Sequence, residues 1–574
     1  MKIVLVGINS KYIHTCLAVW YLKASLRNTG ETVVREFTIN DNKDGILAEI
    51  YKEKPDVLAF SCYIWNYEIV KLLIREIRKL IPECFIILGG PEVSYTAAAV
   101  IKENDPVDFV LCGEGEEVFP VLTEAIQNGS EAYKMLKGIA YRENGEIIYR
   151  EGFNLIPQLD RLNSPYTDAL LESAENRIIY YESSRGCPFN CSYCISSTFN
   201  GVRFFSFERV KTELERLLKF GPKLIKFVDR TFNCNKKRAR EILEYIISLE
   251  CGTVFHFEAA ADLFDEDMLE LLGRAPHGRI QLEIGLQTTN TGTLAEIDRV
   301  TDLGRLKSNV GRILSNSNIH VHLDIIAGLP FEDIISFRGS FNDVYGMKPH
   351  QLQLGFLKML KGARVRNEAE KHGYSYRDFA PYEILENKYI KYQDILVLKD
   401  VEETVERYYN SGRFQKSLLL LEKIYSGDYF ELYRALSVYC RKNAYLDRPI
   451  AYRENIAILS GFVKAELAGR VDMEEFRQAM VFDFLSSDSS CAIPDSIRAD
   501  RDFLPAGRIH EMLRSEDFIK EHLPDFLYTP AKNILKKVFF VSLDLIANSQ
   551  EILIFDYTQK DVVNGKYKNI IIKG

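Results

Sequence analysis

The sequence contains no long hydrophobic run, no excess of basic residues and no repeated or low-complexity tract. No stretch approaches the ~20 uninterrupted apolar residues of a membrane span, and the start MKIVLVGINSKYIHT leads into a strand pattern without a cleavage site. With 73 Lys and Arg against 81 Asp and Glu, the net charge of −8 is the wrong sign for binding phosphate backbones. We therefore expect a cytoplasmic protein without a membrane span and regard nucleic acid as an unfavourable partner.

The sequence also lacks an excess of cysteine: 11 of 574 residues is ordinary usage, and the odd number argues against a framework of disulfides. Several cysteines lie inside apolar runs, for example Cys62, Cys112 and Cys440. A cysteine in such a run is usually a small buried hydrophobe. Three others fall within eight residues of one another, and this group requires a separate explanation.

The first 135 residues alternate short apolar strands with amphipathic helices. This alternation predicts an α/β domain of flavodoxin-like or Rossmann-like type, whose ligands bind at the carboxyl ends of the parallel strands. The strands are expected at 2–8, 33–39, 57–63, 85–90 and 109–113, with a helix at 67–81. At ~100–200 residues per domain, two or three further domains follow.

Residues 136–175 are predicted to form a linker that contains a β-hairpin at 138–150, because the alternation there turns around Asn144-Gly145. A second alternating series over 176–365 predicts six βα units, which fits a barrel or a partial (β/α)6 barrel. Its strands are expected at 177–184, 224–229, 254–259, 280–286, 320–328 and 351–357, with helices such as 207–220 and 236–249 between them.

The strand rhythm stops near residue 370. Residues 366–574 are predicted to form a mostly helical domain with a terminal hairpin around Asn564-Gly565. This region offers no recognisable catalytic motif. Its many aromatic residues are either packing surface or part of a lid over the barrel mouth.

The three clustered cysteines occur in RGCPFNCSYC, which spaces Cys187, Cys191 and Cys194 as C-x3-C-x2-C directly after a predicted strand. A loop of buried thiols is disfavoured, because the neighbouring residues are polar and turn-forming. A structural zinc site needs four ligands, and the nearest candidates, Cys234 and His256, are forty or more residues away. Three thiolates can instead hold three irons of a [4Fe–4S] cluster and leave the fourth iron open.

This motif, with Tyr193 before the last cysteine and a position after the first strand of a βα barrel, resembles the signature of the radical S-adenosylmethionine (SAM) enzymes. In that family SAM chelates the open iron, and one electron cleaves SAM to a 5′-deoxyadenosyl radical that takes a hydrogen atom from the substrate. The resemblance implies Cys187, Cys191 and Cys194 as catalytic metal ligands, with SAM near Tyr193. It also implies a one-electron reductant such as flavodoxin or ferredoxin.

The resemblance extends to other strand ends. Asp229, in FVDRTFN, stands where the family places a group for the SAM amine. Glu283 and Gln287, in QLEIGLQTT, follow the family's E-x-G-x-Q pattern near the ribose and carboxylate of SAM. In IAGLP, Ile326 and Gly328 are expected at the family's backbone edge beside adenine.

Four polar loops follow strands of the N-terminal sheet. Each alone is compatible with a tight βα turn. Together, and placed before a radical SAM core, they resemble the cobalamin-binding domain of the cobalamin-dependent radical SAM subfamily, in which loops such as GGPEVS and GEGEE enclose the cofactor's nucleotide tail. The resemblance implies cobalamin contacts from these loops by Asn9, Ser10, Ser61, Tyr63, Gly89, Gly90, Glu92, Val93, Gly113, Glu114 and Gly115.

Some details of these regions leave two interpretations open. The cobalamin motif D-x-H-x-x-G occurs nowhere, so histidine ligation of cobalt from below is not expected. His14 is either a cobalt ligand or a residue that caps or packs at a helix start. Tyr12 and Trp65 either contact the corrinoid or belong to the core. Arg203 is either a contact to the SAM carboxylate or a solvated surface charge.

The domain order resembles a bacterial group that ends in a domain of unknown function. The expected function is a cobalamin-binding radical SAM enzyme that methylates an unactivated centre of a small-molecule or peptide substrate. Cyclisation, rearrangement or oxidation without methyl transfer stays open, and so does a corrinoid and Fe–S binding sensor or assembly protein. The SAM-supporting strand ends favour the enzyme, whereas the substrate, the lower ligand of cobalt and the oligomeric state are left open.

Overall fold

The computed structural model describes residues 1–26, 30–199, 201–544 and 551–573. Its N-terminal sheet has the strand order β2-β1-β3-β4-β5-β6-β7, and the first five strands run parallel. The order 2-1-3-4-5 is that of flavodoxin, which confirms the predicted fold class. These five strands are β1 (Lys2–Asn9), β2 (Glu31–Thr38), β3 (Val57–Ser61), β4 (Phe85–Gly89) and β5 (Phe109–Leu111).

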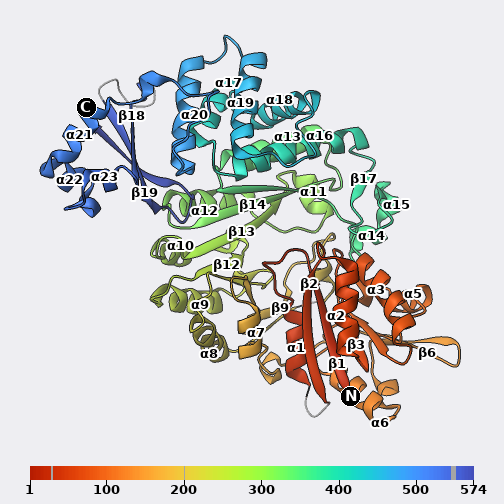
Figure 1. Cartoon of the computed structure of the whole chain (residues 1–574). Helices are drawn as coiled ribbons and strands as arrows, with labels where there is room; N and C mark the ends of the chain where they lie inside the picture. Colours follow the sequence, from red (N-terminus) through yellow and green to blue (C-terminus); the bar gives the residue numbers. More distant parts are fainter. Residues whose placement is uncertain (27–29, 200, 545–550, 574) are drawn as a thin grey trace.

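Helices cover both faces of this sheet (Figure 1). In β1, Ile3 and Leu5 join one apolar core while Val4 and Val6 join another, because successive side chains of a strand point to opposite faces. The first core includes side chains of α1 (Leu17–Ser25) and α6 (Val118–Asn128). The second includes side chains of α2 (Lys43–Glu53), α3 (Tyr67–Leu80) and α5 (Ala97–Glu103).

The hairpin predicted for the linker is formed by β6 (Ile139–Glu143) and β7 (Glu146–Arg150). It does not stand alone in a connecting segment, because β6 pairs antiparallel with β5 and extends the first sheet. Tyr141 lies opposite Phe109, and both join the core on the α1 face. Burial of these two aromatic side chains explains why the hairpin docks on the sheet edge.

The second sheet has six strands in the order β15-β14-β13-β12-β11-β8, and each neighbouring pair is parallel. Sequential order with parallel pairing is the topology of a partial βα barrel, as predicted. Helices cover its outer face (Figure 1). The strands are β8 (Ile179–Tyr181), β11 (Leu224–Phe227), β12 (Val254–Glu258), β13 (Ile280–Gln287), β14 (His320–Ala327) and β15 (Gln351–Phe356), and the helices α8 (Phe207–Leu218), α9 (Lys236–Ser248), α10 (Glu266–Gly273), α12 (Leu303–Ser315) and α13 (Ile334–Gly346).

The remaining chain is mostly helical, as predicted, apart from a short antiparallel strand pair, β16 (Ser375–Tyr376) and β17 (Ile384–Glu386), and a small three-stranded sheet. One apolar core runs from the N-terminal domain through the barrel into these helices. The helices are α16 (Tyr392–Thr404), α17 (Gln415–Ile424), α18 (Tyr429–Lys442), α19 (Tyr452–Glu466) and α20 (Met473–Ser487), followed by α21 (Ala506–Arg514), α22 (Glu516–His522) and α23 (Ala531–Ile534). No helix in the described part of the chain is both long enough and apolar enough to cross a membrane.

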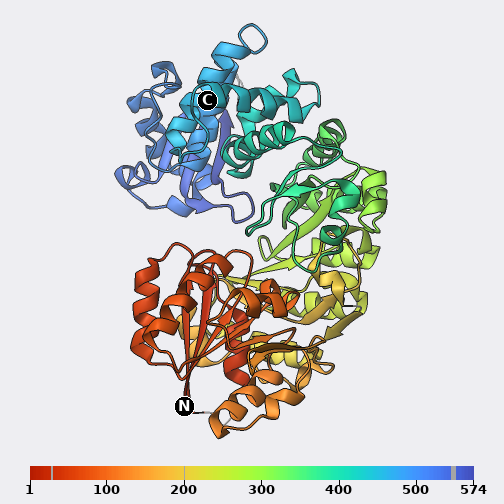
Figure 2. The ribbon, with the colours of Figure 1, turned by 90° about the vertical axis from the view of Figure 1, so that its right-hand side faces the viewer.

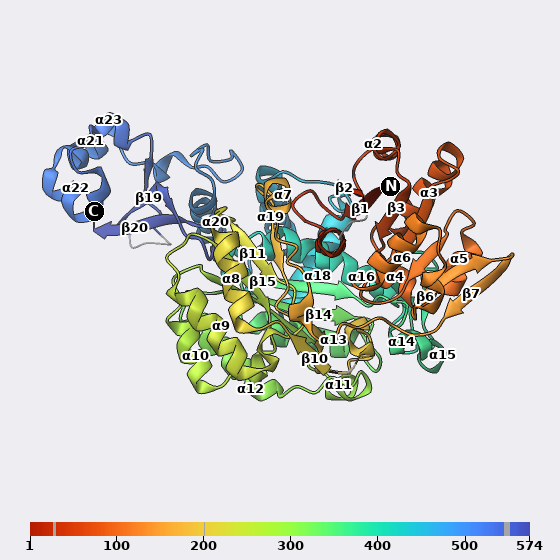
Figure 3. The same ribbon diagram turned by 90° about the horizontal axis from the view of Figure 1, so that it is seen from below.

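The expected terminal hairpin consists of β19 (Glu551–Lys560) and β20 (Tyr567–Lys573), and β18 (Val538–Val541) adds a third strand that the sequence reasoning missed. Its tip reaches the amino ends of the barrel strands. His277 Nε2 lies 2.9 Å from an oxygen of Asp561, and His320 Nδ1 lies 3.0 Å from the carbonyl of Val563. The N-terminal domain and the C-terminal helices lie at opposite ends of the barrel domain (Figures 1 and 2), and α21, α22 and α23 lie on the side away from the N-terminal domain in Figure 3.

Candidate functional site

The first candidate binding surface lies at the carboxyl edge of the N-terminal sheet. Its strand order reverses between β1 and β3, and ligands of doubly wound sheets bind at such a switch point. Tyr63 and Trp65, just after β3, stack with ring centroids 4.4 Å apart. The side chains of Trp65 and Tyr12 are 43% and 64% exposed. Exposed aromatic rings at a switch point fit a large ligand with apolar faces.

The loop after β1 docks on the barrel. The ring of His14 lies 2.6 Å from the hydroxyl of Tyr180 in β8, and the N–H of Ile178 donates to the carbonyl of Ile13. Burial lowers the pKa of His14. Of its two interpretations, the contacts of His14 favour packing.

The predicted polar residues of β1 and β3 shape these loops. Asn9 is buried and donates to the carbonyl of His14 at 3.1 Å and to Glu36 at 3.1 Å, and Ser10 next to it is half-buried. The buried Ser61 accepts at its carbonyl from Asn66 at 2.9 Å. Asn9 and Ser61 therefore lie on the two strands that flank the switch point.

The GGPEVS loop begins at Gly89, the last residue of β4. Gly90 has φ +103°, and a Cβ there would lie 2.6 Å from the Cys62 carbonyl, so glycine is required. Val93 is fully buried. Glu92 is buried too. Its carboxylate accepts a hydrogen bond from the Tyr382 hydroxyl at 2.5 Å and forms an ion pair with Lys361 at 2.9 Å. Glu92 therefore binds the segment that follows the barrel.

The GEGEE loop follows β5. Gly113 has φ +90° and packs on the backbone of Asn154, while a Cβ on Gly115 would lie 2.9 Å from Leu22. Glu114 accepts two hydrogen bonds from the guanidinium of Arg203, at 2.6 and 2.8 Å. Arg203 is thus bound to the GEGEE loop and is not a solvated surface charge. Both predicted loop carboxylates, Glu92 and Glu114, have protein partners in this structure.

Cys187 ends the short strand β9 (Ser184–Cys187), and Cys191 and Cys194 lie on the loop that leads to the antiparallel strand β10 (Gly201–Phe204). We call β9, this loop and β10 the cysteine hairpin; it lies between the two sheets (Figure 1). Cys191 is buried, whereas Cys187 and Cys194 are half-buried. The N–H of Ser192 donates to Ile297 at 2.9 Å and so ties the loop to the barrel.

A half-buried arginine that sequence reasoning did not identify lies against the thiols. Arg299 donates to Cys191 Sγ at 3.6 Å and to the Tyr193 hydroxyl at 3.3 Å. Thr231 Oγ1 lies 3.7 Å from Cys187 Sγ. A guanidinium beside sulfur places a positive charge where a metal-bound thiolate carries its negative charge.

The arrangement of ligands argues against a single zinc ion. Among the described residues, two groups of three or more potential ligands lie close enough to share one ion, and neither contains a cysteine. Burial and the nearby Asp229 raise the pKa of Cys234. His256 is bonded to Glu283 instead. Three thiols on one loop, spread wider than one ion requires, fit a cluster better than zinc.

Asp229 stands at the carboxyl end of β11, buried at 2% exposure. Its oxygens accept from the N–H of Ser183 at 3.1 Å, from the Ser183 hydroxyl at 2.7 Å and from the Ser184 hydroxyl. Burial raises the pKa of Asp229, although these hydrogen bonds lower it in part. Asp229 therefore anchors the chain where it enters the cysteine hairpin.

The side chains of Glu283, in the middle of β13, and Gln287, its last residue, lie on the inner face of the barrel. Burial alone would raise the pKa of Glu283, but bonds from His256 and Lys226, both at 2.9 Å, hold it well below its usual range. Gln287 sits at a register shift with φ +73°. Its Oε1 is buried and has no hydrogen-bond partner among the described residues. An orphaned buried acceptor at a strand end fits a ligand donor.

The IAGLP segment ends β14. Gly328 has φ +90° and accepts at its carbonyl from the Tyr374 hydroxyl at 3.0 Å and from Asn387 Nδ2 at 3.1 Å. Ile326 is half-buried. The C-terminal region therefore supports the backbone edge that was predicted beside adenine.

The inner face of the barrel is more polar than we predicted. Glu258 is mostly buried there, and burial raises its pKa to about 7. The signal was present in the sequence, because every second residue of VFHFE, IQLEIGLQ and HVHLDIIA is mostly polar while the others are apolar. The inward-facing polar residues include Lys226, His256, Glu258, Gln281, Glu283, His322 and Asp324.

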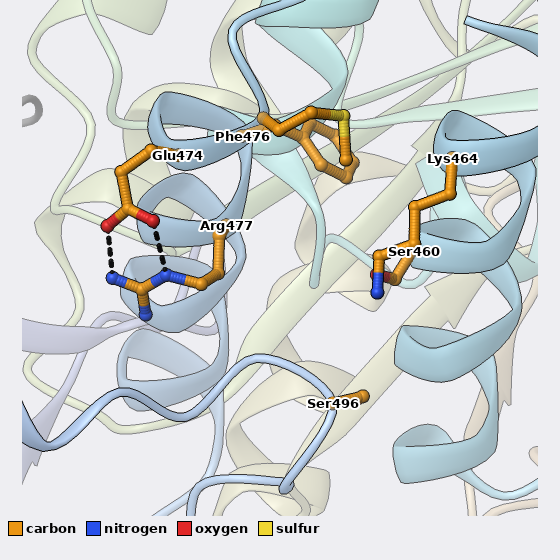
Figure 4. A pocket seen from close by; sticks show the side chains of 7 residues that line it. Ser460, Lys464, Glu474, Phe476, Arg477 and Ser496 are labelled. Carbon is orange, nitrogen blue, oxygen red and sulfur yellow. Dashed lines mark hydrogen bonds and ion pairs between the residues drawn. The ribbon is translucent and has the colours of Figure 1, made fainter. Parts of the chain in front are cut away.

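A separate pocket lies in the C-terminal region between α19 and α20 (Figure 4). Its walls include Ser460, Lys464 and Phe476, and Glu474 pairs with Arg477 at its edge. None of the predicted site residues lines this pocket.

Three family models match consecutive parts of the chain. Residues 3–123 match the B12 binding domain, residues 181–344 the radical SAM superfamily, and residues 370–562 a protein of unknown function (DUF4080). The chain therefore contains a B12-binding domain followed by a radical SAM domain. These domains imply a [4Fe–4S] cluster, SAM and cobalamin as cofactors, as the sequence predicted. The three thiols, the orphaned Gln287 and the exposed aromatic rings fit them.

Curated relatives agree with this family. The cobalamin-dependent radical SAM methyltransferase TokK of Streptomyces tokunonensis is 25% identical over 356 residues, which is 59% of this chain and 51% of TokK. An uncharacterized methyltransferase of Pyrococcus horikoshii is 31% identical over 236 residues, 39% of this chain and 51% of that protein. The anaerobic magnesium-protoporphyrin IX monomethyl ester cyclase of Cereibacter sphaeroides is 21% identical over 345 residues, 57% of this chain and 56% of the cyclase. This chain therefore spans about half the length of the curated relatives it matches.

Solved structures share the fold. The cobalamin-dependent SAM radical enzyme OxsB, with aqua-cobalamin and SAM bound, aligns with a TM-score of 0.59 over 84% of this chain and 78% of its own, at 16% identity. The radical SAM methyltransferase TsrM from Kitasatospora setae aligns with a TM-score of 0.55 over 64% of this chain and 76% of its own, also at 16% identity. At these identities the likeness concerns the fold alone.

Proposed function

We propose that this protein is an anaerobic cobalamin-dependent radical SAM methyltransferase acting on an unactivated centre of a small-molecule or peptide substrate. The observation that carries this proposal is the contact between the loops expected to hold the two cofactors. Glu114 of the GEGEE loop binds Arg203 on the cysteine hairpin, and the Tyr95 hydroxyl, just after GGPEVS, lies 2.7 Å from Thr198 Oγ1. Cofactors held by touching loops can act on one substrate.

In this proposal Cys187, Cys191 and Cys194 hold the cluster, and Glu283 and Gln287 bind SAM. The N-terminal switch point binds cobalamin between its loops. When bound, the cluster supplies the electron that cleaves SAM, and cobalamin carries the methyl group. The protein orients both cofactors and excludes water and oxygen.

Two sets of relatives bear on the reaction type. The methyltransferase names of several relatives support methyl transfer. The cyclase relatives keep cyclisation, rearrangement or oxidation as the alternative. The two differ in products, because methyl transfer yields S-adenosylhomocysteine beside 5′-deoxyadenosine, whereas the alternative yields 5′-deoxyadenosine alone. A one-electron reductant such as flavodoxin or ferredoxin and a cytoplasmic location belong to the same proposal.

The test uses protein purified and reconstituted without oxygen, with reductant, SAM and hydroxocobalamin. We expect about four iron and four sulfide per chain and formation of 5′-deoxyadenosine. Both are lost in Cys187→Ala, Cys191→Ala and Cys194→Ala and retained in the control Cys251→Ala. If 5′-deoxyadenosine persists in Cys191→Ala, the cluster assignment is wrong. Cluster and cobalamin without SAM cleavage would indicate the sensor or assembly protein.

A further inference from the structure

We propose that two arginines of the cysteine hairpin and two glutamates of the GEGEE loop form a positioning clamp that couples the cluster site to the cobalamin-binding domain. The clamp consists of Arg185, Arg203, Glu114 and Glu116. The inference rests on the proposed function, because it assigns a role to contacts between the two proposed cofactor loops.

The clamp joins two paired arginines of the cysteine hairpin to two glutamates that lie two residues apart in the GEGEE loop. Arg185 and Arg203 lie directly opposite each other on β9 and β10. Arg203 binds both oxygens of Glu114, at 2.6 and 2.8 Å. Arg185 pairs with Glu116 at 2.5 Å and approaches Glu114 at 3.4 Å. Both strands that carry the cysteine loop are therefore fixed to one loop of the other domain.

The clamp is shielded from water, so its geometry is stricter than that of a surface ion pair. The side chains of Arg185 and Glu116 are 10% and 8% exposed, and those of Arg203 and Glu114 are 23% and 16% exposed. Arg185 also donates to Glu182 in the barrel at 2.9 Å. The N–H of Ile156 donates to Glu114 at 2.7 Å, so both ends of the clamp are held by further bonds.

Stability alone is a weak reason for such a clamp. Burying charges costs desolvation energy, and apolar side chains of similar volume hold two surfaces together at least as well. A two-point bond between guanidinium and carboxylate instead fixes direction as well as distance. Arg185 lies only two positions before Cys187, so a displacement of the GEGEE loop is transmitted to the first cluster ligand.

A clamp of this kind couples cobalamin binding in the N-terminal domain to the order of the cysteine loop. Cobalamin that orders the GEGEE loop should also order the cysteine loop, and by linkage a formed cluster should tighten cobalamin binding by the same factor. Without the clamp both sites keep their own ligands, and only their mutual influence is lost.

The first experiment needs no catalysis. Hydrogen exchange over residues 188–199 is measured on the full chain without cluster, with and without hydroxocobalamin. In the wild type we expect exchange to slow about tenfold on binding. Arg203→Met should abolish this response while circular dichroism stays unchanged. Arg216→Met, which removes an exposed pair with Asp168, is the matched control and should respond like the wild type.

Arg203→Lys separates positioning from simple attraction. Lysine keeps the charge but cannot make the two-point bond, so we expect it to fail to restore the response. If lysine restores it fully, or if all variants respond like the wild type, the clamp has no positioning role. Wild-type protein that binds cobalamin without any change in exchange would exclude that role as well.

The second experiment uses reconstituted protein. In Arg203→Met we expect formation of S-adenosylhomocysteine, which needs both cofactors, to fall about 100-fold, while formation of 5′-deoxyadenosine stays within about twofold. Equal loss of both products would overturn the clamp and leave the proposed function intact. Absence of both products from the wild type would overturn the proposed function, and the clamp with it.

Discussion

Arg299 donates a hydrogen bond to Cys191 Sγ at 3.6 Å while its guanidinium is buried in the barrel. Reduction makes the cluster more negative, so a fixed positive charge at one sulfur stabilises the reduced form. Loss of a charge-assisted bond worth about 2 kcal/mol should lower the midpoint potential by on the order of 100 mV. We therefore expect Arg299→Met to shift the potential downward in an EPR-monitored redox titration. The exposed Arg312→Met should leave it unchanged, and an equal shift in both variants would remove Arg299 from this role.

Gly285 makes room for the side chain of Gln287. A Cβ at Gly285 would lie 2.2 Å from Gln287 Nε2, so Gly285→Ala must push the amide aside. Because the proposed role of Gln287 is to bind SAM, we expect both Gly285→Ala and Gln287→Ala to weaken SAM binding about tenfold. Equilibrium dialysis with reconstituted protein measures this, and Gly311→Ala, where a Cβ meets open space, is the control. Unchanged affinity in Gln287→Ala would exclude the amide as a SAM contact.

Trp65 offers an exposed ring where cobalamin is proposed to bind. Burying about 50–60 Å² of this ring should contribute about 1.4 kcal/mol. Trp65→Ala should therefore raise the Kd for hydroxocobalamin about tenfold in a spectrophotometric titration. Leu72→Ala, on the exposed side of α3, is the control for loss of an equally exposed apolar side chain. If the two variants bind equally well, cobalamin does not contact this ring.

Glu92 joins the N-terminal domain to the segment after the barrel. Removing its carboxylate leaves Lys361 and the Tyr382 hydroxyl without their partner. Glu92→Ala should cost about 3 kcal/mol, as expected when one member of a buried ion pair is removed. Both tryptophans of the chain, Trp20 and Trp65, lie in the N-terminal domain, so urea unfolding followed by their fluorescence reports on that domain. The exposed Glu124→Ala should leave the transition midpoint unchanged.

Glu332 gives the stability of the chain a pH dependence. It is buried and accepts from Thr288 at 2.5 Å and from Ser340 at 2.9 Å, and burial raises its pKa to about 7. Between the unfolded pKa of about 4.3 and pH 7 the unfolded carboxyl loses its proton while the folded one keeps it, so stability falls as pH rises. Above pH 7 this loss is complete.

Glu332→Gln should therefore remove that part of the pH dependence. We expect the variant to be more stable than the wild type at pH 8 by on the order of 2–3 kcal/mol and similar to it at pH 4. Urea midpoints from far-UV circular dichroism, taken between pH 4 and 8.5, measure the difference. Parallel curves for the two proteins would contradict the assignment.

The sequence predicted what depends on local pattern. Period-two alternation located the strands of both large sheets, and the C-x3-C-x2-C spacing indicated the loop that we propose as the cluster site. It did not predict partners that are distant in the chain. Arg299 lies 108 residues from Cys191, and Glu114 lies 89 residues from Arg203, so no local signal connects them. The missed strand β18 pairs with β19, for which the sequence had predicted only the partner β20, and the short pairs β9-β10 and β16-β17 were missed as well.

The tip of the last hairpin touches the amino ends of β13 and β14 through Asp561 and Val563. Domains fold in order of synthesis, from the N-terminal end onward. The contact between His277 and Asp561 spans 284 residues, so it forms only after residue 561 has left the ribosome. Until then the amino ends of β13 and β14 stay exposed to solvent. A chain truncated before residue 551 should therefore present these strand ends as a recognition surface for chaperones and proteases.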